Sequence, residues 1–304
     1  MELKLNGLIA AVHTPMNDDF SVNYDTVAKQ AEHFAGKGAA GVFVSGTTGE
    51  SLSLSTAERI KLFEVWGKEA DRHGLVNVAH VGCNSLPDAQ ELVRAAEATG
   101  AAAISAMAPT FFKPTDEAAL CAWFVEMTRP APALPFYFYD IPPMTGVTVD
   151  TAAFMLLAKE RLQGFVGIKF TNQDLDLLAR CMNHESVKAD ILFGTDERLI
   201  EGLALGCAGG VGSTYNFAAP LYRRIIDAYN RGDMEAAQAD QARSVKMIER
   251  MFQSGFGGAC KAVMGFAGVD CGPVRPPINR LQPEAEASLR ADLDAMGFFD
   301  WALK

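Results

Sequence analysis

The chain has 304 residues, of which 49% are hydrophobic and 21% are charged, a composition typical of a globular protein with a large apolar core. That length accommodates two ordinary domains or one α/β barrel. The net charge of −10 argues against nucleic acid or an anionic membrane as a partner, and no segment reaches the ~20 apolar residues of a membrane span. The first residues carry no cleavage pattern, so we expect no signal peptide.

Short apolar segments rich in β-branched residues alternate with amphipathic segments along most of the chain. We expect strands at 7–15, 41–47, 76–82, 102–109, 135–142, 165–171, 190–197 and 209–214. Helical patterns lie between them at 24–37, 55–71, 86–99, 116–128, 150–161 and 174–181. Eight strand–helix units in ~230 residues predict an α/β fold, the (β/α)8 TIM barrel, which usually takes ~250. The rival is a doubly wound open sheet, which usually has fewer strands and a glycine-rich first turn that this chain lacks.

After residue 217 the pattern is helical only, with expected helices at 233–253, 257–267 and 283–296. No flexible linker separates these helices from the strands. We therefore predict a catalytic barrel over 1–230 and a C-terminal helical extension over 231–304 that packs on the barrel.

Six cysteines are scattered along the chain, without a Cys-x-x-Cys pair or a histidine at metal-ligand spacing. Disulfide frameworks and zinc sites need tighter clustering, whereas an isolated cysteine in an apolar segment behaves as a small hydrophobic residue. We expect buried, free thiols in a reducing cytoplasm.

A lysine interrupts the sixth apolar segment. Because strand side chains alternate, the segment has two faces: Val166, Ile168 and Phe170 on one, and Phe165, Gly167, Lys169 and Thr171 on the other. The all-apolar face suits the layer under the helices. Lys169 then points into the barrel near the strand's C-terminal end, where barrel enzymes carry their active sites. The alternative is a packed stem with its ammonium group reaching solvent.

A lysine in a partly desolvated barrel mouth has a lowered pKa and offers a neutral amine. Such an amine forms a Schiff base with a ketone and activates the adjacent carbon–carbon bond. Tyr139, near the end of the preceding expected strand, is a candidate proton shuttle. The segment 45–50, SGTTGE, offers backbone N–H groups and hydroxyls for a carboxylate; a tight turn that only caps the next helix is the alternative.

Five segments resemble signature motifs of the dihydrodipicolinate synthase and N-acetylneuraminate lyase superfamily of pyruvate aldolases: VSGTTGE (44–50), YDIPPMTG (139–146), GIKFT (167–171), FGTDE (193–197) and GSTYN (212–216). The resemblance covers almost the whole chain. Two further segments are most similar to the vertebrate-type lyase branch: LSLSTAER (52–59) and GFGGACKAVMGFAGV (255–269). The resemblance implies a class I aldolase that reversibly cleaves a sialic acid, N-acetylneuraminate, to N-acetylmannosamine and pyruvate. It also implies that the enzyme needs no metal or organic cofactor and is a homotetramer.

The resemblance also implies roles for single residues. Lys169 would form the Schiff base with pyruvate, and Tyr139 would move protons at the bond that breaks. Thr47 and Thr48 would bind the pyruvate carboxylate. Contacts with the hydroxyls of the substrate are implied for Thr171, Gly194, Asp196, Glu197 and Ser213. The acidic pair in this group also begins an expected helix, where negative charge is favoured in any protein.

Two departures from family patterns affect these expectations. Met144 stands where dihydrodipicolinate synthases have an arginine for the second substrate's carboxylate; it offers neither charge nor donor, which favours a neutral sugar aldehyde. Many relatives also insert a tyrosine into a neighbouring subunit's site, but the matching positions here are Phe111 and Phe112. We expect Tyr139 to rely on Thr48 or on water instead.

Other functions remain open on the sequence. They are another pyruvate-dependent sugar-acid aldolase, a dihydrodipicolinate-synthase-like enzyme, and a sugar-binding barrel without activity. A binding protein has no need of an imine-forming lysine, which argues against the sugar-binding barrel without activity. His13 and His80 end expected strands, but metal ligands must converge within ~2.0–2.2 Å of one ion, and strand alternation gives no sign that they do. We expect no metal site.

Overall fold

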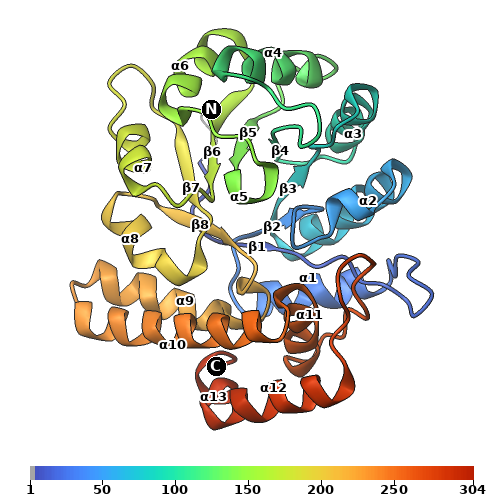
Figure 1. Ribbon diagram of the computed structural model, residues 1–304, viewed down its shortest axis with the longest axis vertical. Helices are drawn as coiled ribbons and strands as arrows, with labels where there is room; N and C mark the ends of the chain where they lie inside the picture. Colours follow the sequence, from blue (N-terminus) through green and yellow to red (C-terminus); the bar gives the residue numbers. More distant parts are fainter. Residues whose placement is uncertain (1–3) are drawn as a thin grey trace.

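Eight parallel strands close into a barrel that helices surround (Figure 1) in the computed structural model, which describes residues 4–304. The strands are β1 (Gly7–Ala11), β2 (Gly41–Val44), β3 (Val76–His80), β4 (Ala103–Met107), β5 (Phe136–Asp140), β6 (Phe165–Phe170), β7 (Asp190–Phe193) and β8 (Gly209–Gly212). They follow chain order, and β8 pairs with β1. The predicted TIM barrel is confirmed. The predicted domain 1–230 includes residues 1–3, which lie outside the described residues, and its boundary stays a prediction.

A helix follows every strand, and most of the helices cover the outside of the barrel (Figure 1). They are α1 (Thr26–Gly36), α2 (Thr56–His73), α3 (Leu86–Ala98), α4 (Glu117–Thr128), α5 (Pro142–Thr145), α6 (Thr151–Arg161), α7 (Leu175–Met182), α8 (Leu199–Ala204) and α9 (Tyr215–Asn230), with short 3-10 helices η1 (Ser51–Ser53) and η2 (Asp196–Arg198). The η1 helix comes before α2 and η2 before α8, and the short α5 lies over the barrel mouth (Figure 1). Helix α2 shows how the sequence sets a boundary. Ser55 Oγ accepts the N–H of Glu58, and the Glu58 carboxylate accepts the N–H of Ser55 at 2.8 Å, which satisfies two N–H groups that the helix leaves free.

Apolar side chains fill both faces of the strands. One core lies between the strands and the helices, and a second, smaller core fills the barrel interior with side chains that include Ile9, Phe43, Tyr137 and Leu192. Strands that are buried on both faces need nearly continuous apolar sequences. This explains why the strand segments do not alternate between polar and apolar residues.

The start of β6 departs from the predicted alternation. The register between β5 and β6 shifts between Phe136 and Tyr137, which leaves Val166 as an additional residue in β6. Phe165 therefore packs in the outer core and Val166 against the inner one, so the prediction is wrong for these two residues. Beyond the shift the alternation holds, and Lys169 points into the barrel.

The chain ends in four helices that pack on one side of the barrel (Figure 1). They are α10 (Met234–Gln253), α11 (Phe256–Phe266), α12 (Pro283–Ala295) and α13 (Phe298–Trp301). The three predicted helices match α10, α11 and α12 to within one residue at each end. Helix α10 lies along α9, and α11 returns to the barrel mouth. Within residues 4–304, no helix combines the length and apolar character that a membrane crossing requires.

Candidate active site

Lys169 is almost completely enclosed at the C-terminal end of β6, with 3% of its surface exposed. Its Nζ lies 4.1 Å from the centroid of the Phe43 ring and 3.8 Å from that of the Tyr139 ring. Burial lowers the pKa of Lys169 from 10.5 to about 7, and the nearby Asp196 carboxylate opposes this shift only in part. Near neutral pH a large fraction of the side chain is therefore an uncharged amine, the form that attacks a carbonyl carbon.

The amine opens into a cavity of ≈ 440 Å³ at the C-terminal ends of the strands. All nine predicted site residues line this cavity: Thr47, Thr48, Tyr139, Lys169, Thr171, Gly194, Asp196, Glu197 and Ser213. They come from five of the eight strand–loop junctions, so only the closed barrel brings them together. Their roles in binding and catalysis stay predictions.

Tyr139 contacts a different threonine from the one expected. Its hydroxyl lies 3.3 Å from Thr47 Oγ1, whereas Thr48 Oγ1 lies 2.7 Å from Ser213 Oγ. The prediction that Thr48 assists the phenol directly does not match this geometry, because the two neighbouring threonines point to different sides of the turn. Burial raises the pKa of Tyr139 to about 12, so the phenol keeps its proton at neutral pH and can donate it.

The turn that carries these threonines has an unusual backbone. Ser45 and Glu50 have φ values of 59° and 58°, in the left-handed region that non-glycine residues rarely adopt. The Glu50 N–H donates to the Thr47 carbonyl at 3.0 Å, and the Thr14 hydroxyl donates to the Gly49 carbonyl at 2.7 Å. A tight turn of this kind directs backbone N–H groups toward a common point, as binding of a carboxylate requires.

A buried arginine supports the start of the turn. Arg59 on α2 is 2% exposed, and its guanidinium donates to Ser45 Oγ at 3.1 Å, to the Gly82 carbonyl at 3.1 Å and to the His80 carbonyl. The His80 ring nitrogen Nδ1 lies 3.0 Å from the Ser45 carbonyl oxygen. Sequence reasoning missed this role. A signal was present, since Arg59 shares the buried face of α2 with Leu62.

The histidines do not form a metal centre with their neighbours. Among residues 4–304, no group of three or more His, Cys, Asp or Glu side chains could hold a metal ion. Burial lowers the pKa of His13 to about 3 and that of His80 well below 6.5. Both rings are therefore neutral at physiological pH.

Polar groups form one side of the cavity. The Asp196 Oδ2 atom accepts hydrogen bonds from the Thr214 N–H at 2.9 Å and the Thr214 hydroxyl at 2.6 Å, and burial raises the pKa of this carboxyl to about 6. Its Oδ1 atom accepts no hydrogen bond from the described residues, so it is free to accept one from a ligand. Gly194 is required by crowding, because a Cβ there would lie 1.9 Å from Thr171 Oγ1.

The C-terminal extension forms the opposite, apolar side. The rings of Phe252 on α10 and Phe256 on α11 stack with centroids 4.5 Å apart, and Cys260 and Ile278 complete this wall. Met144 on α5 lies at the rim with 60% of its surface exposed. The cavity therefore has the amine of Lys169 at its base, a polar wall on one side and an apolar wall on the other.

Comparison with known proteins agrees with this architecture. Residues 4–296 match the model of the dihydrodipicolinate synthetase family. The chain is 37% identical to N-acetylneuraminate lyase of Gallus gallus over 300 residues, which cover 96% of each chain. It is 35% identical to N-acetylneuraminate lyase of Rattus norvegicus over 303 residues, which cover 98% of this chain and 94% of that one.

Solved structures of N-acetylneuraminate lyases have the same fold as this chain. The structure of Proteus mirabilis N-acetylneuraminate lyase superposes with a TM-score of 0.94 at 36% identity and covers 97% of this chain and 100% of that chain. That of the sialic acid aldolase from Aliivibrio salmonicida gives a TM-score of 0.94 at 35% identity, over 97% and 98% of the two chains. These four relatives are named N-acetylneuraminate lyases or sialic acid aldolases, and the chain belongs to the dihydrodipicolinate synthetase family.

Proposed function

We propose that this protein is an N-acetylneuraminate lyase, a class I aldolase that reversibly converts N-acetylneuraminate into N-acetylmannosamine and pyruvate. The observation that carries the proposal is the enclosed amine of Lys169, with its pKa lowered to about 7 beside the protonated phenol of Tyr139. A binding protein gains nothing from an uncharged lysine, whereas imine chemistry depends on one. The names of the relatives supply the substrate.

The reaction begins when Lys169 Nζ attacks the keto carbon C2 of the open-chain sugar acid. Loss of water gives a protonated imine. When the C4 hydroxyl loses its proton, the C3–C4 bond breaks, and its electron pair moves toward the imine as an enamine. Protonation of C3 and hydrolysis then release pyruvate and restore the amine. Proton transfers accompany each of these bond changes, so the site needs a proton donor and acceptor beside the amine.

Tyr139 is the group that we assign to the proton transfers. Its phenol lies beside the amine and keeps its proton at neutral pH, so it can give that proton to the carbinolamine hydroxyl that leaves as water when the imine forms. The phenolate that results then takes the proton of the C4 hydroxyl as the C3–C4 bond breaks, and in the reverse direction the phenol protonates the C4 alkoxide. Thr47, 3.3 Å away, is its hydroxyl partner. We assign the pyruvate carboxylate to the turn that holds Thr47 and Thr48, whose N–H groups are not used by a helix or strand.

The rest of the cavity fits a polyhydroxylated, N-acylated chain. The polar wall offers acceptors and donors for several hydroxyls, and it consists of Thr171, Gly194, Asp196, Glu197 and Ser213. The apolar wall of the extension suits the methyl group of an N-acetyl substituent. The rim residue Met144 offers no cation to a carboxylated aldehyde, which favours the sugar over the second substrate of a dihydrodipicolinate synthase.

We also propose a homotetramer in the cytoplasm, which is how we interpret the family resemblance. Phe111 and Phe112, in the loop after β4, are 77% and 87% exposed, and such apolar surface favours association. The six cysteines are free, and five of them are buried, which is compatible with a reducing compartment. Light scattering of the purified protein tests the number of subunits.

Borohydride trapping tests the function. Reduction in the presence of pyruvate should attach a pyruvyl group to the peptide that contains Lys169, and the Lys169→Met variant should give no adduct. A panel of sugar acids then tests the substrate. Faster cleavage of a deoxygluconate-type acid than of N-acetylneuraminate would refute the choice of substrate, and lack of any adduct would refute the aldolase mechanism.

A further inference from the structure

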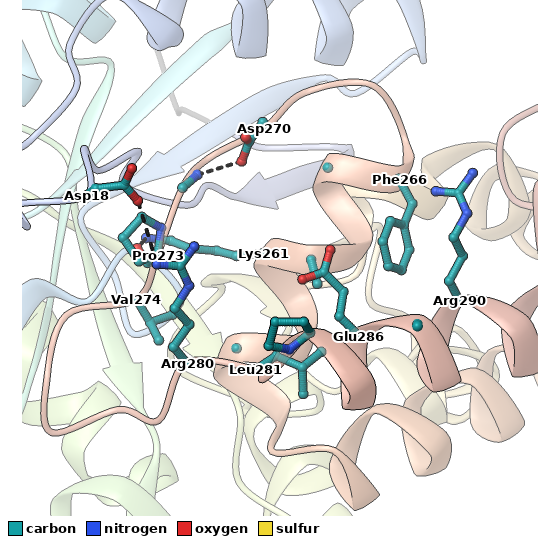
Figure 2. A pocket seen from close by; sticks show the side chains of 16 residues that line it. Asp18, Lys261, Phe266, Asp270, Pro273, Val274, Arg280, Leu281, Glu286 and Arg290 are labelled. Carbon is teal, nitrogen blue, oxygen red and sulfur yellow. Dashed lines mark hydrogen bonds and ion pairs between the residues drawn. The ribbon is translucent and has the colours of Figure 1, made fainter.

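Helix α11 lies between two cavities. The active-site cavity is on its inner side, where Cys260 lines it. A second cavity, of ≈ 600 Å³, lies on its outer side between α11, α12 and the segment 270–274 (Figure 2). Figure 2 shows Lys261 extending from α11 toward Pro273. The backbone of Lys261 thus belongs to the C-terminal extension, whereas its ammonium group lies beside the turn at the barrel mouth.

The ammonium group of Lys261 meets the turn of the active site there. Its Nζ lies 2.7 Å from Glu50 Oε1 and donates to the Pro273 carbonyl at 2.7 Å. The other carboxylate oxygen of Glu50 accepts the N–H of Arg275 at 2.7 Å. Each side chain of the ion pair has only 3% of its surface exposed. Two segments of the extension therefore converge on one carboxylate of the barrel.

Glu50 is the last residue of the turn that we assign to the pyruvate carboxylate. Its φ of 58° lies in the left-handed region, and its N–H closes the turn onto the Thr47 carbonyl. Such a conformation persists only where the surroundings fix it. Two contacts on the Glu50 carboxylate supply that fixation, since its side chain cannot leave without breaking both.

Replacement of one partner is costly because a buried ion pair hides both charges from water. An unpaired buried carboxylate must take up a proton or rotate toward solvent. Rotation would release the turn. His13 does not replace the lost charge, since it is neutral and lies near Lys261, whose charge further lowers the pKa of its ring.

We propose that Lys261 and Glu50 are positioning residues for the keto acid. Through this ion pair the C-terminal extension holds the turn at Thr47 and Thr48 in the shape that binds the carboxylate. The pair touches no reacting atom. It acts on how tightly pyruvate binds before the imine forms, and it leaves the reactivity of Lys169 unchanged. The inference rests on the proposed aldolase function, and it adds a residue from outside the barrel to the machinery.

The test is borohydride trapping of pyruvate over a range of pyruvate concentrations. The variants are Lys261→Met, Glu50→Gln and the double variant, and the control is Lys61→Met, which removes an exposed ion pair with Glu64. We expect Lys261→Met to raise the half-saturating pyruvate concentration by about tenfold or more and to change the trapping rate at saturation by less than about threefold. The double variant should have a lower half-saturating pyruvate concentration than Lys261→Met, because it no longer contains the unpaired Glu50 carboxylate.

Thermal unfolding of each variant separates positioning from stability alone. A lowered melting temperature with an unchanged half-saturating concentration in Lys261→Met would overturn the inference, and so would single-variant effects that simply multiply in the double variant. If Lys261→Met does not fold, Glu50→Gln decides, and normal pyruvate affinity there overturns the proposal. If the unmodified protein forms no pyruvyl adduct, the aldolase function fails instead.

Discussion

Replacing Lys169 with methionine removes one ionisable group and keeps a chain of similar length in the barrel interior. Burial lowers the pKa of Lys169 from 10.5 to about 7, so between these values the unfolded chain binds a proton that the folded protein does not. Stability rises with pH wherever the unfolded state binds more protons. The wild-type protein should therefore gain stability relative to Lys169→Met as pH rises above 7, and the gain should end near 10.5.

The magnitude follows from the same two values. Linkage predicts that wild type gains ~2.5 kcal/mol in unfolding free energy relative to Lys169→Met between pH 7.5 and 9.5. This window lies above the range where Asp196, with a pKa of about 6, changes charge in the folded protein. At pH 7.5 the variant should be the more stable protein, because it has no amine to desolvate.

Urea unfolding at several pH values between 7.5 and 9.5 measures this difference for the two proteins. The Lys61→Met variant is the control, since Lys61 lies at the surface and its ammonium group stays in water in both states. A difference between wild type and Lys169→Met that stays constant to within about 0.5 kcal/mol across the window would refute the lowered pKa. The chemical argument for a neutral amine would then fail with it.

Three further substitutions test the assignments around the amine. Thr47→Val removes the hydroxyl next to Tyr139, whereas Thr48→Val breaks only a contact with Ser213. Thr47→Val should therefore lower turnover by at least about tenfold more than Thr48→Val does. Steady-state kinetics of both variants measures the difference. Asp196→Asn should raise KM for the sugar acid several-fold and leave pyruvate trapping intact, because the carboxylate lies on the polar wall. Met144→Arg should change stability by less than about 0.5 kcal/mol and improve binding of aldehydes that carry a carboxylate.

Each of these has a result that contradicts it. A slower Thr48→Val than Thr47→Val would restore Thr48 as the partner of the phenol. Weaker pyruvate trapping in Asp196→Asn would place Asp196 with the keto acid instead of the sugar. Unchanged discrimination between neutral and carboxylated aldehydes in Met144→Arg would remove the argument from the rim.

Local patterns in the sequence predicted the barrel correctly. The nine residues that the motifs predicted for the site line one cavity, and their roles stay predictions. The existence of every strand was correct, but several predicted strands ran too far at their C-terminal ends, for example 190–197 against β7 (Asp190–Phe193). The additional residues 194–197 are Gly-Thr-Asp-Glu, and they turn away from the barrel to form the site. Gly, Asp and Glu are depleted in strands, so the sequence carried a signal for the earlier end of this strand.

Two other features depended on tertiary contacts that no local pattern contains. The register shift at Val166 depends on how β6 pairs with β5, and strand alternation assumes that no such shift occurs. Lys261 lies in an apolar helical segment, and its partner Glu50 is 211 positions away in the chain. A buried lysine in such a segment signals a partner, but only the folded chain identifies which one.

The apolar wall of the cavity comes from Phe252, Phe256 and Ile278, long after the last strand has been made. A ribosome that has released only the eight strands has therefore produced a ring whose mouth stands open to water. The cavity around the amine is therefore complete only after the C-terminal helices have been made and have packed on the barrel.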